Sequence, residues 1–165
     1  VHMSSYAPLF AHIEGWQWRP DLIWFDNLRS FRSCSWYVQK LYTQYSGTNV
    51  LKLTDMDGIN ITGADGQMGL FASSVYDADN GRIYMKVINV SDQPQQIKVN
   101  FEGLRKKESL RGAETVSFHS DDPDAENTLD EPFRIVPQTG ALDFEGKVLE
   151  TTVAPKTFMV YVIQK

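Results

Sequence analysis

Residues 69–90, GLFASSVYDADNGRIYMKVINV, decide the class of fold. Two runs rich in β-branched and aromatic residues, 69–77 and 81–90, flank the polar stretch Ala78-Asp79-Asn80. The dipeptide Asn80-Gly81 is a turn signal, because both residues tolerate the left-handed backbone of a tight hairpin. The stretch therefore predicts two antiparallel strands joined by a short turn.

The same texture extends on both sides of this hairpin. Residues 95–103 alternate, with Ile97, Val99 and Phe101 on one face. Further strands are predicted at 51–54, 115–120, 133–137, 148–153 and 157–164, and the acidic stretch 121–132 is predicted to be a loop. Many short strands separated by Gly and Pro are typical of a β-sandwich or barrel, so residues 48–165 are interpreted as a mainly β domain.

The first 47 residues have a different pattern. Residues 6–11, YAPLFA, form an apolar run that suits a strand buried on both faces, and a Trp-rich loop follows at 14–20. An amphipathic helix comes next, with Ser33 or Ser35 as its N-cap and Gly47 as a left-handed C-cap. Its apolar stripe comprises Cys34, Tyr37, Val38, Leu41, Tyr42 and Tyr45. A single βα unit cannot cover both faces of a parallel strand, so residues 4–47 are expected to be part of a larger domain, after a cloning remnant at 1–3.

Composition argues against several classes of partner. The net charge is −5 and the pI about 5.1, which does not suit a nucleic-acid binder, and Arg105-Lys106-Lys107 is interpreted as a solvated turn. No apolar stretch is long enough to span a membrane. The single cysteine, Cys34, permits no internal disulfide. No signal peptide is recognised, and because the start looks cut, an export signal is expected upstream if the parent is periplasmic or extracellular.

Metal ligands and nucleophiles give little support for a catalytic centre. The histidines His2, His12 and His119 have no paired spacing, and no metal or cofactor is expected. The stretch 77–81 resembles a calcium loop only faintly, and a hairpin turn is favoured. A second calcium alternative is the acidic run, whose usual structure is a solvated loop: Asp121, Asp122, Asp124, Glu126, Asp130 and Glu131. No G-x-S-x-G elbow or phosphate-binding loop is present.

Two glycosylation sequons occur, at Asn60 and Asn89. They matter only in a eukaryotic secretory route, and Asn89 is interpreted as a turn residue.

The loop at 14–20 is the most suggestive stretch for ligand binding. Trp16 and Trp18 offer flat apolar faces and Gln17 offers a donor and an acceptor, the combination that binds sugar rings. The alternative, favoured on the residues alone, is that both tryptophans fill an interface between domains.

Three segments together resemble the α-L-arabinofuranosidases of glycoside hydrolase family 51. SYAPLFAHIEGWQWRPDLIWFDN at 5–27 resembles the family's eighth barrel strand and its loop, and WYVQKLYTQYSG at 36–47 resembles the eighth helix. HSDDPDAENTLDEPFRIVP at 119–137 resembles the A-E-N-(S/T)-x-D-x-P stretch of the family's C-terminal sandwich. The resemblance implies an antiparallel, jelly-roll-like β-sandwich preceded by one βα unit of a (β/α)8 barrel.

The resemblance also implies a chemistry and its limits. Such enzymes remove terminal arabinofuranosyl residues from arabinan or arabinoxylan with retention, using two glutamates on the fourth and seventh barrel strands. Those strands precede this chain, and Glu14 fits neither family motif, so no catalytic residue is assigned. Gln17 and Trp18 would be substrate contacts in the full-length enzyme, since barrel active sites are built by the loops after the strands.

Three functions remain open at this level. The first is a non-catalytic C-terminal part that supports the catalytic barrel of the same polypeptide. Its barrel-facing surface would be exposed here and would cause self-association: Leu22, Ile23, Trp24, Tyr37 and Leu41. The second is a carbohydrate-binding module that uses Trp16 and Trp18. The third is a hydrolase that uses carboxylates of the acidic loop.

Overall fold

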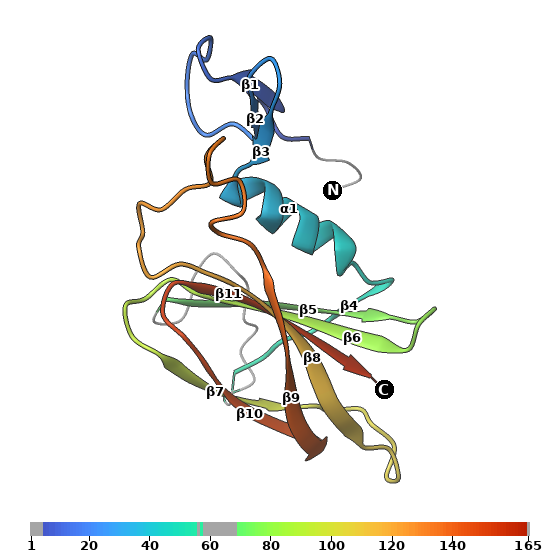
Figure 1. Ribbon diagram of the computed structural model, residues 1–165. Helices are drawn as coiled ribbons and strands as arrows, with labels where there is room; N and C mark the ends of the chain where they lie inside the picture. Colours follow the sequence, from blue (N-terminus) through green and yellow to red (C-terminus); the bar gives the residue numbers. More distant parts are fainter. Residues whose placement is uncertain (1–4, 56, 58–68, 165) are drawn as a thin grey trace. The chain divides into compact units, whose positions relative to one another are not determined.

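The computed structural model describes residues 5–55, 57 and 69–164, and the chain divides into two compact units (Figure 1). The first unit comprises residues 1–44 and 122–136, and the second comprises residues 45–121 and 137–165. The segment 122–136 thus joins the first unit instead of continuing the predicted span 48–165. One cause is Asn127, whose side-chain amide donates to the main-chain oxygen of Arg32 at 3.0 Å. The assignment of the units to a barrel remnant and a sandwich domain stays a prediction.

The second unit is built from antiparallel strands. Its strands are β4 (Asn49–Leu51), β5 (Leu70–Asp77), β6 (Arg82–Asn89), β7 (Gln95–Asn100), β8 (Leu110–His119), β9 (Gln138–Gly146), β10 (Val148–Val153) and β11 (Thr157–Gln164). Six of them form one sheet in the order β4-β5-β6-β11-β8-β9, and β10 pairs with β7 in a second. Every pair is antiparallel, which confirms the predicted mainly β fold.

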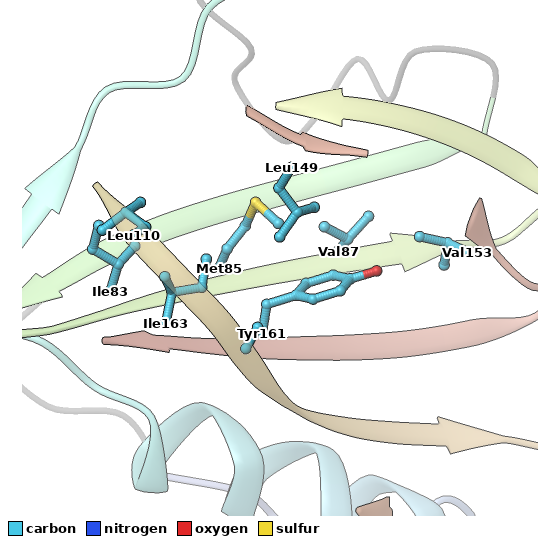
Figure 2. Packing of buried hydrophobic residues seen from close by; sticks show 9 residues of the cluster. Ile83, Met85, Val87, Leu110, Leu149, Val153, Tyr161 and Ile163 are labelled. Atoms are coloured by element: carbon cyan, nitrogen blue, oxygen red, sulfur yellow. The ribbon is translucent and has the colours of Figure 1, made fainter. Parts of the chain in front are cut away.

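The core of this unit lies between the two sheets. Alternate residues of β6 and β11 point toward the β7–β10 pair, because side chains alternate between faces along a strand. Figure 2 shows Met85 and Tyr161 from the large sheet beside Leu149 from β10. The buried cluster comprises Ile83, Met85, Val87, Leu110, Ala113, Leu149, Val153, Tyr161 and Ile163. Burying each large aliphatic side chain contributes about 1.5–3 kcal/mol, so this cluster is the main source of stability in the unit.

The hairpin predicted at 69–90 is confirmed. Asp77 pairs with Arg82 at the end of β5 and β6, and Gly81 adopts a φ of 66°. The Asp77 carboxylate accepts hydrogen bonds from the main-chain amides of Asp79 and Asn80 and from the Asn80 side chain. These donors, the Asn80 side chain foremost, hold the pKa of Asp77 below its usual value. The carboxylate therefore organises the turn, as the hairpin interpretation required.

Several predicted boundaries were wrong. Residues 133–135 form a turn and bends, residues 136 and 137 are irregular, and the strand follows them as β9. Pro132 precedes this stretch and Pro137 ends it, and both limit main-chain pairing. Strand β4 starts before the predicted 51–54, and β8 starts before the predicted 115–120 and includes a bulge between Arg111 and Ala113.

The first unit contains a small mixed sheet and the only helix of the described residues. Strand β1 (Phe10–His12) runs parallel to β2 (Ile23–Phe25), which pairs antiparallel with β3 (Ser30–Arg32). The sequence predicted a strand at 6–11 and missed β2 and β3. It also predicted burial on both faces, whereas Phe10 is 58% exposed, because only one face of this three-residue strand is covered in the chain.

Helix α1 (Cys34–Gln44) begins where predicted. The Ser33 hydroxyl accepts from the Trp36 amide at 3.3 Å and so confirms the predicted N-cap. Tyr37 and Leu41 are the buried residues of its apolar stripe. Gly47 is not the left-handed C-cap that was predicted, since its φ is not positive. A Cβ there would lie 2.7 Å from the Tyr76 oxygen, so the close approach of two backbones requires this glycine.

Candidate functional site

The candidate site is the loop between β1 and β2, residues 13–22. The main chain fastens both ends of this loop: the Ile13 amide donates to the Phe25 oxygen at 3.0 Å, and the Leu22 amide donates to the Pro8 oxygen at 3.3 Å. The Gly15 amide donates to the His12 oxygen at 3.0 Å and closes a turn. The loop is therefore anchored at its base and projects residues 14–20, which are all exposed.

A cation lies against two aromatic rings in this loop. The Arg19 guanidinium carbon is 5.2 Å from the centroid of the Trp16 ring and 5.0 Å from that of Trp24. The two rings meet edge to face, with centroids 5.8 Å apart. Trp24 is buried in β2, whereas Trp16 keeps 46% of its surface exposed. Arg19 thus connects the exposed loop to a fixed ring through cation–π contacts.

The two predicted substrate contacts, Gln17 and Trp18, lie between Trp16 and Arg19 in the sequence. Gln17 is exposed, and Trp18 is exposed to 58%. Trp24, by contrast, is buried in the interior of the unit. A planar ring and an amide presented to solvent on an anchored loop suit the recognition of a sugar, whose C–H faces pack on aromatics and whose hydroxyls bond to amides.

Two ion pairs that the sequence analysis missed join the segment 122–136 to residues 1–44, and one of them lies in this loop. Arg19 Nη1 donates to both Glu126 oxygens, at 2.9 and 3.2 Å. A second pair joins Arg29 to Asp130 at 2.9 Å. The partners in the first pair are 107 positions apart in the sequence, and no local pattern links them. The only available signal was the excess of acidic residues at 121–131 in an otherwise mixed chain.

The acidic run is not a gathered cluster of carboxylates. Asp121 contacts His119 at 2.9 Å, and Asp122 contacts Arg134 at 3.7 Å. Within the described ranges, no three His, Cys, Asp or Glu side chains are grouped as metal ligands would be. Four of the six residues proposed as calcium ligands or catalytic acids therefore have separate basic partners, which leaves the calcium and hydrolase alternatives without structural support.

The remaining polar groups singled out in the sequence have structural roles. His12 Nδ1 accepts from the Glu14 amide at 3.2 Å, and His119 bonds to Thr157. Arg105 belongs to an exposed turn closed by Glu108, as predicted. Burial, followed by the nearby Glu126 charge, raises the pKa of Cys34, so this thiol is not an activated nucleophile. Across the part of the chain that the structure covers, no helix is long and apolar enough to cross a membrane.

Asn89 is the last residue of β6, and its side chain holds the turn that follows, close to the turn role that the sequence analysis favoured. The Asn89 side chain is fully buried, and its amide nitrogen donates to main-chain oxygens of Gln93 and Ala154. Its oxygen accepts from the Ser91 amide at 3.0 Å. This side chain is therefore inaccessible in the folded unit. Asn60 and His2 lie outside the described residues.

The residues predicted to form an open, barrel-facing surface are largely covered among the residues that the structure describes. Of the five residues predicted to form it, Leu22, Trp24, Tyr37 and Leu41 are buried, and Ile23 is half-buried. They are covered within the chain itself, so the predicted exposure was wrong, and self-association stays a prediction.

A neighbouring carboxylate was missed by the sequence analysis. Asp21 is 1% exposed, and neither of its oxygens has a hydrogen-bond partner among the residues described. Such a group is costly, because a buried carboxylate normally needs donors.

The other face of the small sheet carries a cleft. Phe10, Ile23 and Arg32 are aligned across the three strands, as are Ala11, Trp24 and Phe31. The residues that line the cleft are Phe10, Ile23, Arg32, Phe25 and Ser30. Because side chains alternate along a strand, this cleft and the buried Trp24 lie on opposite faces of the sheet.

The structure so far shows a mainly β domain with an anchored loop that exposes two tryptophans, and comparisons with known proteins identify its family. The family model for the α-L-arabinofuranosidase C-terminal domain matches residues 1–156, and the chain belongs to that family. It is 30% identical to Alpha-L-arabinofuranosidase 2 of Arabidopsis thaliana over 161 residues, 96% of this chain and 22% of that protein. It is 33% identical to the Extracellular exo-alpha-L-arabinofuranosidase of Streptomyces chartreusis over 138 residues, 78% of this chain and 16% of that protein.

Solved structures agree on the fold. An arabinose-bound MgGH51 α-L-arabinofuranosidase matches with a TM-score of 0.78 and 24% identity, over 97% of this chain and 24% of that one. An α-L-arabinofuranosidase from Thermotoga maritima in complex with arabinose matches with a TM-score of 0.71 and 14% identity, over 88% and 32%. The chain thus spans less than a third of the length of these proteins, and it is a C-terminal domain of an α-L-arabinofuranosidase family member.

Proposed function

We propose that this chain is the C-terminal part of a retaining α-L-arabinofuranosidase and is not catalytic by itself. Its partner is the catalytic barrel of the same polypeptide, which it supports. The observation that carries this proposal is the family match over residues 1–156 in a chain that spans about a quarter or less of its curated relatives. Terminal arabinofuranosyl residues of arabinan or arabinoxylan side chains are the proposed substrate.

The β1–β2 loop is the proposed contribution of this chain to the sugar site. Gln17 and Trp18 are the candidate contacts, because both are exposed on a loop whose ends are fastened by main-chain hydrogen bonds. Preorganised contacts of this kind bind without the cost of ordering the loop. The two glutamates of the retaining reaction would come from the barrel.

The test compares this chain with the full-length polypeptide in the hydrolysis of 4-nitrophenyl α-L-arabinofuranoside. We expect activity from the full-length polypeptide and none from the 165-residue chain. Activity of the chain alone would mean that its own carboxylates catalyse the reaction, and the proposal would be wrong. In the full-length polypeptide, Trp18→Ala should raise KM, with Tyr42→Ala, an exposed aromatic of α1, as the matched control.

A carbohydrate-binding module is the second candidate. It is favoured by the exposure of Trp16 and Trp18 on one anchored loop. Binding of the isolated chain to arabinan or arabinoxylan, measured by calorimetry and lost on Trp18→Ala, would support this function.

A further inference from the structure

The dipeptide Gln17-Trp18 is enclosed between two residues that hold each other. Trp16 precedes it and Arg19 follows it, and the Arg19 guanidinium lies 5.2 Å from the Trp16 ring centroid. The same guanidinium lies 5.0 Å from the Trp24 ring in β2. The positions of Gln17 and Trp18 therefore depend on where the Arg19 side chain lies.

Cation–π contacts alone hold an arginine weakly, because they constrain its distance from the ring more than its direction. Glu126 constrains the orientation of the Arg19 guanidinium, because both of its carboxylate oxygens accept from Arg19 Nη1, at 2.9 and 3.2 Å. Glu126 is itself adjacent to a fixed residue. Asn127 is 1% exposed and is hydrogen-bonded to the main chain of Arg32 and Ile135.

We propose that Glu126 is a positioning residue for the substrate loop: through Arg19 it fixes Trp16, and thereby the orientation of Gln17 and Trp18 toward the sugar. The inference rests on the proposed function and deepens it. Glu126, in the acidic segment, then affects substrate affinity although it does not contact the sugar.

In the alternative explanation, the ion pair of Glu126 and Arg19 is purely structural and only attaches the segment 122–136 to the rest of the unit. The chain offers a matched control for it. Arg29 and Asp130 form a second exposed ion pair at 2.9 Å between the same two parts of the unit, and among the described residues Arg29 lies over no aromatic ring. A fastening role predicts equal effects of breaking either pair, whereas a positioning role predicts an effect from Glu126 alone.

The first experiment measures KM and kcat for 4-nitrophenyl α-L-arabinofuranoside with the full-length polypeptide. Glu126→Gln should raise KM about three- to fivefold, with kcat changed by less than about twofold, as expected when binding contacts loosen and the reacting groups are untouched. Asp130→Asn should leave both constants at the wild-type values. In an Arg19→Met background, Glu126→Gln should add nothing further, because Glu126 acts through Arg19. An unchanged KM in Glu126→Gln, or an equal rise in Asp130→Asn, would overturn the proposal.

The second experiment separates this inference from the proposed function. Hydrogen exchange of the 165-residue chain should accelerate at residues 13–20 in Glu126→Gln and not in Asp130→Asn. If the wild-type full-length polypeptide does not hydrolyse the substrate, the proposed function is wrong, and with it the role of Glu126 in sugar binding. If hydrolysis occurs and loop exchange in Glu126→Gln equals that of the wild type, the positioning role is wrong while the proposed function stands.

Discussion

The side-chain amide of Asn127 pairs with the main chain of Ile135 as a neighbouring strand would. Its oxygen accepts from the Ile135 amide at 2.7 Å, and its nitrogen donates to the Ile135 oxygen at 2.9 Å. The same nitrogen donates to the oxygen of Arg32 in β3 at 3.0 Å. One buried amide thus closes the loop 127–135 and ties it to the small sheet.

Asn127→Ala should strongly destabilise the first unit. The substitution leaves the Ile135 amide and two carbonyls without their partner in a buried place, at about 1–3 kcal/mol for a lost buried partner. We expect the free energy of unfolding to fall by about 2–4 kcal/mol. Urea unfolding followed by tryptophan fluorescence measures this directly, because all four tryptophans belong to residues 1–44. Asn100→Ala, an exposed asparagine at the end of β7, should change the value by less than about 0.5 kcal/mol.

Hydrophobic patterning explains which parts of the fold were predictable. Strands β5, β6, β10 and β11 and helix α1 have apolar periods and turn residues that agree with their structure, so the sequence located them. The failure at 133–137 has a physical cause: Ile135 and its neighbours resemble a strand in composition, but the main chain of Ile135 is paired with the side chain of Asn127 and not with another strand. A side chain that takes the place of a partner strand leaves no pattern of alternating hydrophobic residues in the sequence.

The candidate site was predictable only in part. Trp16, Gln17 and Trp18 were recognisable because aromatics beside an amide in a loop are unusual. The pairing of Arg19 with Glu126 was not, since it depends on the return of the chain after 107 positions. Residue types identify what a loop can bind, whereas the groups that orient the loop are defined by tertiary structure.

Gly47→Ala should destabilise the second unit. The new Cβ would lie 2.7 Å from the Tyr76 oxygen and 2.9 Å from the Val75 Cβ, so two backbone segments must separate. Overpacking of this kind costs about 1–3 kcal/mol. Thermal unfolding followed by far-ultraviolet circular dichroism would detect it as a lower Tm. Gly15→Ala meets only ordinary contact, 3.9 Å from the His12 Cβ, and a similar loss of Tm there would contradict this explanation.

Lys86 should make stability depend on pH in the alkaline range. Its ammonium is buried and donates to the Tyr45 oxygen at 2.6 Å, and burial lowers the pKa of Lys86 below 10.5. Between the lowered value and 10.5 the unfolded chain binds more protons than the folded one, so this group makes the free energy of unfolding rise with pH. Urea unfolding at about pH 7 and about pH 9.5 should show the rise in the wild type and a smaller one in Lys86→Met. Equal slopes in both proteins would mean that Lys86 is ionised at the same pH in the folded and unfolded states.

Asp21→Asn should stabilise the 165-residue chain. The carboxylate is almost fully buried and has no donor among the described residues. The amide keeps the volume and removes the charge that is costly to bury, so we expect the free energy of unfolding near neutral pH to rise by about 1–2 kcal/mol. Tryptophan fluorescence in urea reports on this unit, and Asp130→Asn, an exposed carboxylate, should change stability by less than about 0.5 kcal/mol. A less stable Asp21→Asn chain would contradict this explanation, because it would mean that the carboxylate has a donor in solution.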